Sequence, residues 1–214
     1  MQTDTDVLSS EGTTTAERIT HAAEREFAER GFDGAGMKAL SQRAEVSQAL
    51  LHYHFGSKDQ LYREVVRRRS KLIYDTRVAL LDAVDLRGED ALGKILDALF
   101  RPPLGPAGGD QAYTRIFGGL IVGRERERAL VREFYDPTAQ RFIAALQELE
   151  TEMTQKTAAH AYTLALGALV VVISRDGRLE RLMGEEQNRH TEEVLEGLIT
   201  FARGGITALV AHET

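Results

Sequence analysis

Apolar side chains recur along most of this chain at the three- and four-residue spacing of amphipathic helices. Ile19, Ala23 and Phe27 follow one another at intervals of four, and Thr14 opens a Thr-x-x-Glu pattern typical of a helix N-terminus. Gly31 stands where a helix-ending glycine is expected. There is no convincing run of period-two alternation and no internal repeat. The pattern predicts an all-α protein whose first helix begins at Thr14.

Two very short helical stretches, 37–44 and 48–54, come next and are separated by a three-residue turn. Ser47 has the position of an N-cap for the second stretch, and Ser57 has the same position before a long helix expected over 58–86. The inner side of the long helix is expected to carry Leu61, Val65, Leu72 and Leu80.

Further helices are expected over 89–100, 110–123, 125–134, 137–152, 155–175 and 188–210. Proline and glycine dominate residues 101–109, which predicts a loop there. The apolar run at 164–173 has about half the roughly 20 residues that a bilayer-spanning helix needs, so it is interpreted as part of a buried helix. The last helix carries two apolar stripes, Val194, Leu198, Ala202 and Leu209 on one side and Leu195, Ile199 and Ile206 on the other.

Charge is distributed unevenly along a chain whose net charge is −6. Residues 35–74 contain eight Lys and Arg against three Asp and Glu, whereas residues 75–214 contain 16 against 22. A basic segment on an acidic body favours contact with a polyanion through one part of the chain, although a solvated helix face would have the same composition. The chain has no cysteine and begins without a signal peptide pattern, so we expect a cytoplasmic protein without a membrane segment.

Residues 46–61, VSQALLHYHFGSKDQL, bring polar and aromatic side chains together on a short predicted helix. Two short helices joined by a tight turn form a helix-turn-helix unit, whose second helix enters the DNA major groove. The apolar side chains expected to hold that helix in place are Val46, Leu51 and Phe55. Gln48 could bond an adenine edge, and Tyr53, His54 and Lys58 are suited to phosphates.

The text GFDGAGMKALSQRAEVSQALLHYHFGSKDQLYREVV at 31–66 resembles the TetR family of bacterial helix-turn-helix transcriptional regulators. The resemblance implies a flexible segment over 1–12, a three-helix DNA-binding domain over 13–58, and an all-helical ligand-binding and dimerisation domain over 59–214. The residues that it places against DNA are Lys38, Ser47, Gln48, Ala49, Leu50, His52, Tyr53, His54 and Lys58.

Three positions depart from the family pattern. Ala35-Gly36 replaces the Thr or Ser that usually opens the second helix. Glu45 occupies a turn position where glycine is usual, and a left-handed conformation there would cost about 1–2 kcal/mol. His52 stands where tyrosine is usual. These departures affect specificity rather than family membership.

The resemblance also implies that the last two helices pair with a second subunit as a four-helix bundle. The expected interface residues are Leu166, Leu169, Val170, Ile173, Val194, Leu195, Leu198, Ile199, Ala202 and Ile206. Candidates for an effector pocket are Leu99, Phe100, Tyr113, Arg115, Phe117, Tyr135, Phe142, His160 and Tyr162. Arg115 would pair with an anionic group, and ordinary core packing is the alternative for each of the others.

The resulting hypothesis is a homodimeric repressor that binds operator DNA and is released by a small hydrophobic, acyl or aromatic effector. An activator, a regulator without ligand control, and a ligand-binding protein with a degenerate DNA head remain as alternatives. His52 and His54 do not suggest a metal site, because residues two apart on a helix point to different faces and no third ligand is near. No nucleophile or acid–base pattern is present, so we expect neither an enzyme nor a cofactor.

Overall fold

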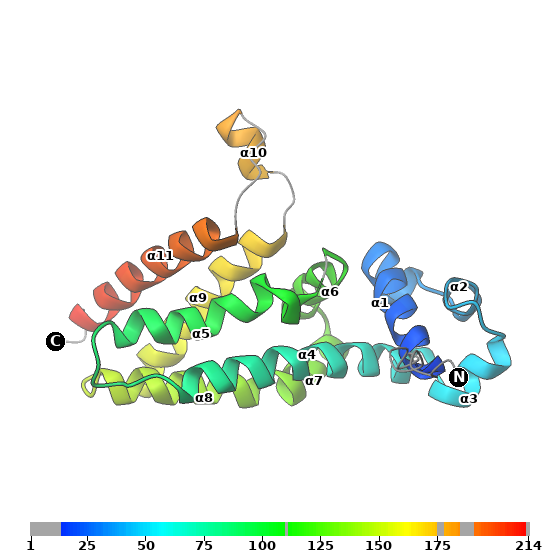
Figure 1. Cartoon of the computed structure of the whole chain (residues 1–214), viewed down its shortest axis with the longest axis horizontal. Coiled ribbons are helices and arrows are strands. Elements are labelled where there is room, and N and C mark those ends of the chain that lie inside the picture. Colours follow the sequence, from blue (N-terminus) through cyan, green and yellow to red (C-terminus); the bar gives the residue numbers. More distant parts are fainter. Residues whose placement is uncertain (1–13, 110, 175–177, 185–190, 213–214) are drawn as a thin grey trace, which may run out of the picture.

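The computed structural model describes residues 14–109, 111–174, 178–184 and 191–212. All regular elements in these ranges are helices, which confirms the predicted all-α fold (Figure 1). The expected flexible segment 1–12 lies outside the described residues. In chain order the helices are α1 (Thr15–Gly34), α2 (Met37–Arg43), α3 (Gln48–Phe55), α4 (Lys58–Asp82), α5 (Ala91–Leu104), the 3-10 helix η1 (Pro106–Gly108), α6 (Gln111–Val122), α7 (Glu125–Phe134), α8 (Asp136–Leu149), α9 (Gln155–Ser174), α10 (Arg178–Met183) and α11 (Thr191–Ala211).

The helices form two groups joined by α4 (Figure 1). Helices α1, α2 and α3 lie together at one end, and α4 runs from them into a bundle that contains α5, α8, α9 and α11. Helix α10 projects away from the bundle, and the C-terminus lies at the end opposite α3. With 25 residues, α4 is about 37 Å long, which lets one rigid element belong to both groups.

The N-terminal helices begin where their local sequence predicts, but α1 continues past the predicted end at Gly31. The Thr14 hydroxyl accepts a hydrogen bond from the Glu17 backbone N–H, and the Glu17 carboxylate accepts one from the Thr14 N–H, which completes the predicted capping box. Gly31 has a φ of 66° and interrupts α1, although helical hydrogen bonding resumes as far as Gly34. Ser47 and Ser57 cap α3 and α4 as predicted.

Several boundaries differ from prediction, among them the end of α8, which lies at Leu149 instead of residue 152. Helix α4 ends at Asp82 instead of continuing to residue 86. Helix α5 continues through Pro102 and Pro103 to Leu104, where a loop was predicted over 101–109. Pro103 has no N–H to donate to the Leu99 carbonyl four residues earlier. The Arg77 side chain of α4 donates to this carbonyl instead. Residues 175 and 188–190 of the last two predicted helices lie outside the described residues.

The inner side of α4 differs from the predicted one after its second turn. It follows a strict four-residue interval through Leu61, Val65, Arg69, Ile73, Arg77 and Leu81. Leu72 was expected inside but is 46% exposed, and Leu80 is half-buried. The prediction was wrong because it placed leucines inside and arginines outside, whereas the interval carries two arginines inward.

Helix α9 is also less buried than its composition suggested. Leu164 and Val171 are exposed on one side, while Leu169 on the other side is fully buried. By length and composition alone, α9 and α11 are both apolar enough to cross a membrane. A bundle helix with one open apolar side has the same composition, so this likeness to a membrane span is weak evidence.

The turn between α2 and α3 contains a strained residue. Glu45 has a φ of 55°, in the left-handed region that the sequence indicated for this position. Its backbone N–H donates to the Gln42 carbonyl, and the next N–H, of Val46, donates to Ser41, so the turn is fixed by hydrogen bonds. The Glu45 side chain is exposed, which leaves nothing on its side chain to offset the backbone strain.

We therefore predict that Glu45→Gly stabilises the protein by about 0.5–1 kcal/mol, because relief of the left-handed strain exceeds the entropy that glycine adds to the unfolded chain. Glu45→Ala removes the same carboxylate but keeps the strain, so it is the matched control. Urea unfolding followed by circular dichroism measures both variants. Equal stability of the two variants would contradict the prediction.

Candidate nucleic-acid interface and interior cavity

Helix α3 is held against the N-terminal group by a small apolar side. Leu51 is completely buried, and Val46 and Phe55 are half-buried, in agreement with their expected anchoring role. The Ser47 hydroxyl accepts a hydrogen bond from the Leu50 N–H at 3.1 Å and so fixes the start of the helix. A short helix with one buried side chain and two flanking contacts presents the rest of its surface to solvent.

The exposed side of α3 contains six of the residues proposed from sequence to touch DNA. Tyr53 is 84% exposed and Leu50 37% exposed. The other exposed members are Gln48, Ala49, His52 and His54. The His52 ring donates through Nδ1 to the Gly56 carbonyl at 2.7 Å, which leaves its other nitrogen facing outward. The six side chains are therefore all exposed, and they point around α3 in every direction except the side of Leu51 and Phe55.

The two lysines proposed for this surface are placed differently. Lys38 is exposed near the start of α2. Lys58 is partly buried, its ammonium donates to the Phe32 carbonyl at 2.9 Å, and the same nitrogen lies 4.3 Å from the centre of the Phe32 ring. Lys58 therefore ties the start of α4 to the end of α1, and it does not project with the α3 side chains.

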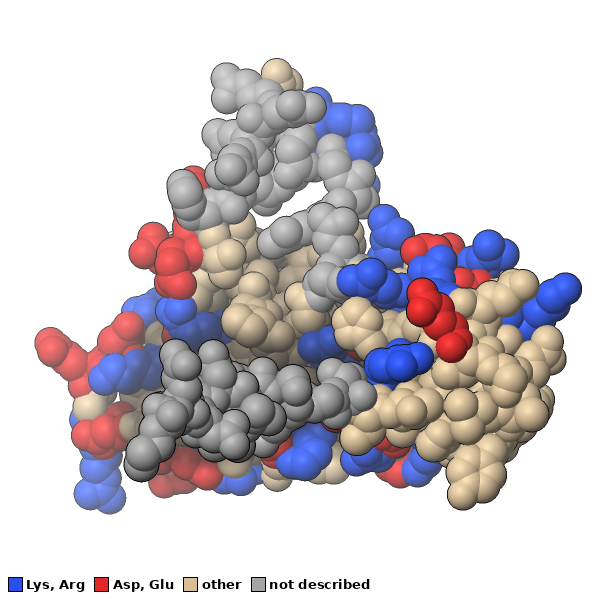
Figure 2. All heavy atoms as spheres, turned by 45° about the vertical axis from the view of Figure 1, so that its right-hand side comes forward, with Lys and Arg blue, Asp and Glu red and all other residues tan. Residues whose placement is uncertain are grey.

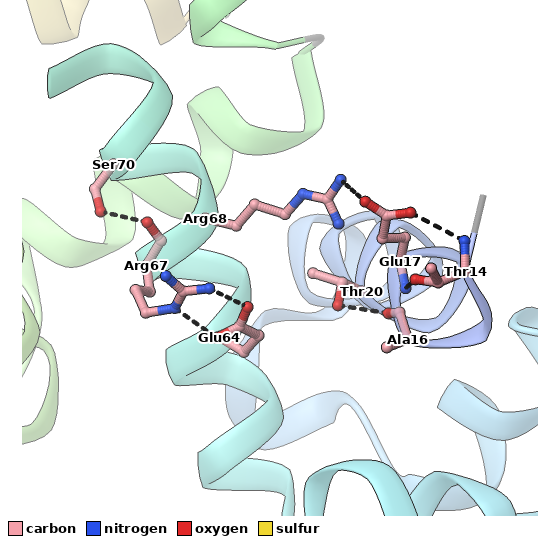
Figure 3. A network of polar contacts seen from close by, with 8 residues as sticks. All are labelled: Thr14, Ala16, Glu17, Thr20, Glu64, Arg67, Arg68 and Ser70. Atoms are coloured by element: carbon pink, nitrogen blue, oxygen red, sulfur yellow. Dashed lines mark hydrogen bonds and ion pairs between the residues drawn. The ribbon is translucent and has the colours of Figure 1, made fainter. Parts of the chain in front are cut away.

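Several other basic side chains near this surface are paired with carboxylates. Arg43 bonds both Glu26 and Glu29, and the Arg43 guanidinium lowers the pKa of the Glu29 carboxyl. Arg68 of α4 pairs with Glu17 of α1 at 3.0 Å (Figure 3). Space-filling shows Lys and Arg gathered on the upper side of the N-terminal group and a largely uncharged front (Figure 2).

Arg69 makes the more buried link between the two groups of helices. Its guanidinium pairs with Glu24 of α1 at 2.9 Å, and both side chains are largely buried. It also lies 5.6 Å from the centre of the Tyr113 ring on α6. Gly109 has a φ of 78°, and a Cβ there would fall 2.7 Å from the guanidinium carbon, so a larger residue would strain the loop and displace the Arg69 guanidinium. Arg69 thus contacts the N-terminal helices and the bundle together.

A small cavity lies inside the bundle beside these residues. Its volume is about 10 Å³, and its walls come from α4, the α5–η1 region, α6, the residue between α7 and α8, and α9. The residues lining it are Ile73, Arg77, Pro103, Gly108, Tyr113, Thr114, Phe117, Tyr135 and Ile173. The Tyr113 and Tyr135 hydroxyls are hydrogen-bonded to each other, and burial raises the pKa of both, so they remain neutral at physiological pH.

The effector candidates proposed from sequence divide into three groups. Tyr113, Phe117 and Tyr135 line the cavity. Leu99, Phe100, Phe142 and Tyr162 are buried in the surrounding core. Arg115 and His160 are exposed and do not line the cavity. The charged group at the cavity is Arg77, which the sequence analysis missed although it continues the four-residue interval from Leu61.

A second hollow, of about 1120 Å³, is an open apolar groove between α9 and α11. Val194, Leu198, Ala202 and Ile206 of the predicted dimer interface line it. Leu169, Ile173 and Leu195 are instead buried within the chain, and Leu166, Val170 and Ile199 are half-buried outside the groove lining. The exposed residues that form its rim were missed, namely Leu164, Val171 and Phe201, the last 72% exposed.

Comparison with known proteins identifies the family. The family model described as "Bacterial regulatory proteins, tetR family" matches residues 19–65, and "Tetracyclin repressor-like, C-terminal domain" matches residues 96–205. The chain belongs to the TetR family. The match confirms the resemblance seen in residues 31–66 and extends it to the second half, and it supports a DNA-binding transcriptional regulator.

Three individual proteins to which the chain is similar are between 13% and 28% identical to it. The chain is 28% identical over 187 residues to the HTH-type transcriptional activator FasR of Mycolicibacterium smegmatis, covering 87% of this chain and 80% of FasR. It shares its fold with PfmR of Thermus thermophilus at a TM-score of 0.64 and 20% identity, covering 86% of this chain and 96% of PfmR. The fatty acid degradation regulator FadR of Bacillus halodurans also gives a TM-score of 0.64, at 13% identity, covering 88% of this chain and 97% of FadR.

One departure from the TetR pattern can be tested at Gly36. This residue is the N-cap of α2 and makes no side-chain cap bond, yet its φ of −100° and ψ of 151° resemble those of Ser47. A Cβ there would meet nothing within 4 Å. We predict that Gly36→Ser stabilises the protein by about 1 kcal/mol, because a hydroxyl would bond an unpaired N–H of α2. This would raise the melting temperature by about 2–4 °C.

Calorimetry of Gly36→Ser beside Gly36→Ala separates the cap from the backbone effect. Both replacements reduce the entropy of the unfolded chain, but alanine cannot cap. A gain in Gly36→Ala as large as in Gly36→Ser would contradict the capping explanation.

Proposed function

We propose that the chain is a homodimeric, ligand-responsive transcriptional repressor that reads operator DNA through α3. The observation that carries the proposal is the exposure of Gln48 and Tyr53 on a helix anchored by the buried Leu51. A reading helix needs a fixed axis and free polar side chains, and α3 has both. The TetR-family relationship supports the same conclusion.

The contacts that α3 would make follow from the chemistry of its exposed residues. Gln48, in the first turn, can bond the N6 and N7 edge of an adenine in a bidentate manner. Ala49 and Leu50 can contact a thymine methyl, and Tyr53 and His54 can bond phosphates beside the groove. Because the Lys58 ammonium is bonded to Phe32, we assign Lys58 to positioning α4, and Lys38 to the phosphate backbone.

The groove between α9 and α11 is the surface that we assign to the second copy of this chain. Gly167, Gly197 and Gly205 line this groove, and a Cβ at each would meet nothing within 4 Å. Glycine inside a helix costs about 0.5–1 kcal/mol relative to alanine, so three glycines with open space around them need a reason outside the monomer. Close approach of a partner backbone supplies it, and the exposed Phe201 and Val171 would be covered at the same time.

Dimerisation also has a purpose in recognition. A single short helix gives modest affinity, whereas two copies held about 34–36 Å apart read successive major grooves of a two-fold operator. An effector in the bundle could change that separation by moving α4, because Arg69 ties α4 both to Glu24 of α1 and to Tyr113 beside the cavity. A coupling of about 1–3 kcal/mol would weaken operator binding about 5–150-fold.

Activation is a second candidate for the sign of regulation. The relative FasR, 28% identical, is a transcriptional activator. A reporter gene behind the bound promoter separates the two: deletion of this protein raises expression for a repressor and lowers it for an activator. The regulator would act in the cytoplasm, where its DNA target is.

We predict that Gln48→Ala and Tyr53→Ala each weaken binding to the operator by about 5–150-fold, since each removes a contact of about 1–3 kcal/mol. Genomic fragments captured by the purified protein supply the operator, and gel shifts at several salt concentrations measure the affinity. Gln140→Ala, an exposed glutamine on α8, is the matched control and should bind as the parent does.

Binding must also weaken as salt rises, because neutralising phosphates releases counterions. Unchanged affinity in both α3 variants would remove α3 as the reading helix. Absence of any salt-dependent binding would favour a degenerate DNA head.

We further predict that Phe201→Glu converts the dimer to a monomer, because the carboxylate would be buried without a partner in the α9–α11 interface. Val122→Glu is the control, since Val122 is 85% exposed but lies on α6, outside the groove. Sedimentation equilibrium measures the mass of each variant, and circular dichroism checks that the helices remain. A dimeric, folded Phe201→Glu protein would place the interface elsewhere.

A further inference from the structure

Arg77 is a charged residue in the interior that lacks a carboxylate partner among the described residues. It is 2% exposed and lies on the inner side of α4, four residues after Ile73. Burial lowers the pKa of its guanidinium, and the groups that next affect it are the hydroxyls of Tyr162 and Tyr135. Burying an unpaired guanidinium is strongly unfavourable, so its position needs a physical reason.

Part of that reason is structural. The Arg77 Nε–H donates to the Leu99 carbonyl at 2.9 Å. In an unbroken helix this carbonyl would accept from the N–H of residue 103, but Pro103 has none. Arg77 therefore completes the hydrogen bonding of α5 where proline interrupts it. This bond uses one of five N–H donors and does not require a positive charge, so it leaves the terminal nitrogens of the guanidinium unexplained.

The cavity lies beside the Arg77 side chain, which is one of its lining residues. Tyr113, Tyr135 and Thr114, which carry neutral hydroxyls, also line it. Apolar side chains, Ile73, Phe117 and Ile173, form much of the rest of the wall. One cation, a few neutral donors and apolar walls together suit a molecule with one negative charge and an apolar body.

We propose that this cavity is the effector site and that Arg77 binds the carboxylate of a hydrophobic monocarboxylic acid. The inference rests on the proposed function, because it names the ligand class of the regulator's sensor domain. The planar guanidinium presents paired N–H donors that match the two oxygens of a carboxylate. With about 10 Å³ of space, close to the room of one water molecule, the cavity must open as the apolar body enters.

Opening the cavity would act on the link between the two groups of helices. Tyr113 is one of the residues that line the cavity. The centre of its ring also lies 5.6 Å from the Arg69 guanidinium. Arg69 in turn pairs with Glu24 of α1. An acid that displaces Tyr113 would therefore disturb the ion pair that fixes α1, and with it α3, relative to α4.

The experiment compares acids with alcohols of the same carbon skeleton on the full-length protein. Octanoate and benzoate are titrated beside 1-octanol and benzyl alcohol, with binding followed by isothermal titration calorimetry and thermal unfolding. We expect the acids to bind and to raise the melting temperature, and the alcohols to bind at least tenfold more weakly. Equal binding of acid and alcohol, or no binding of either acid, overturns the proposal.

Three variants test the residue itself. Arg77→Gln keeps an N–H donor for the Leu99 carbonyl but removes the charge, and it should lose acid binding at least tenfold. Arg77→Lys keeps the charge and a donor, so it should retain the preference for acid over alcohol. Arg115→Gln, on the exposed side of α6, is the control and should bind as the parent does. A purely structural role would lower the stability of Arg77→Gln without changing the acid-to-alcohol ratio, which would also overturn the proposal.

Operator binding is measured separately, by gel shift of the same protein without any acid. A parent that binds operator but ignores the acids refutes the ligand class and leaves the regulator intact. A parent that binds the acids but no DNA supports the Arg77 site and refutes the proposed regulatory function. If Arg77→Gln does not fold, loss of the acid preference in the charge-retaining Arg77→Lys variant counts against the site.

Discussion

The buried side of α4 is the constraint on which the rest of the molecule depends. A four-residue interval turns Leu61, Val65, Arg69, Ile73 and Arg77 toward the interior along one helix. Leu61 and Val65 are fully buried, Arg69 contacts both α1 and α6, and Arg77 bonds α5. Because one rigid helix spans both groups, the orientation of α3 is tied to the packing around a cavity in the other half of the chain.

The two inward arginines have different physical roles in this arrangement. Arg69 is compensated by Glu24, and a paired, largely buried charge of this kind fixes geometry more than it adds stability. The Arg77 side chain donates to the Leu99 carbonyl, and its charge has no carboxylate partner among the described residues. Helix α4 thus carries an arginine paired with a carboxylate and, two helical turns later, an arginine without one.

Much of the N-terminal group could be predicted from sequence because its signals are local. The capping serines, the glycine at residue 31 and the exposed polar side of α3 all depend on neighbours within four residues. The interior cavity could not be predicted in the same way. Its wall combines five segments far apart in the chain, and Arg115 and Arg77 look equally suitable until the fold shows which of them is buried.

The sequence by itself determined the helical elements, most of their boundaries and the exposed residues of α3, since spacing and caps act within one helix. Only the tertiary structure decided which apolar side of α9 and α11 faces inward and which faces the open groove. Both sides are apolar, so periodicity gives no preference between them. The choice depends on α5, α6 and α8, which pack against these two helices from distant parts of the chain.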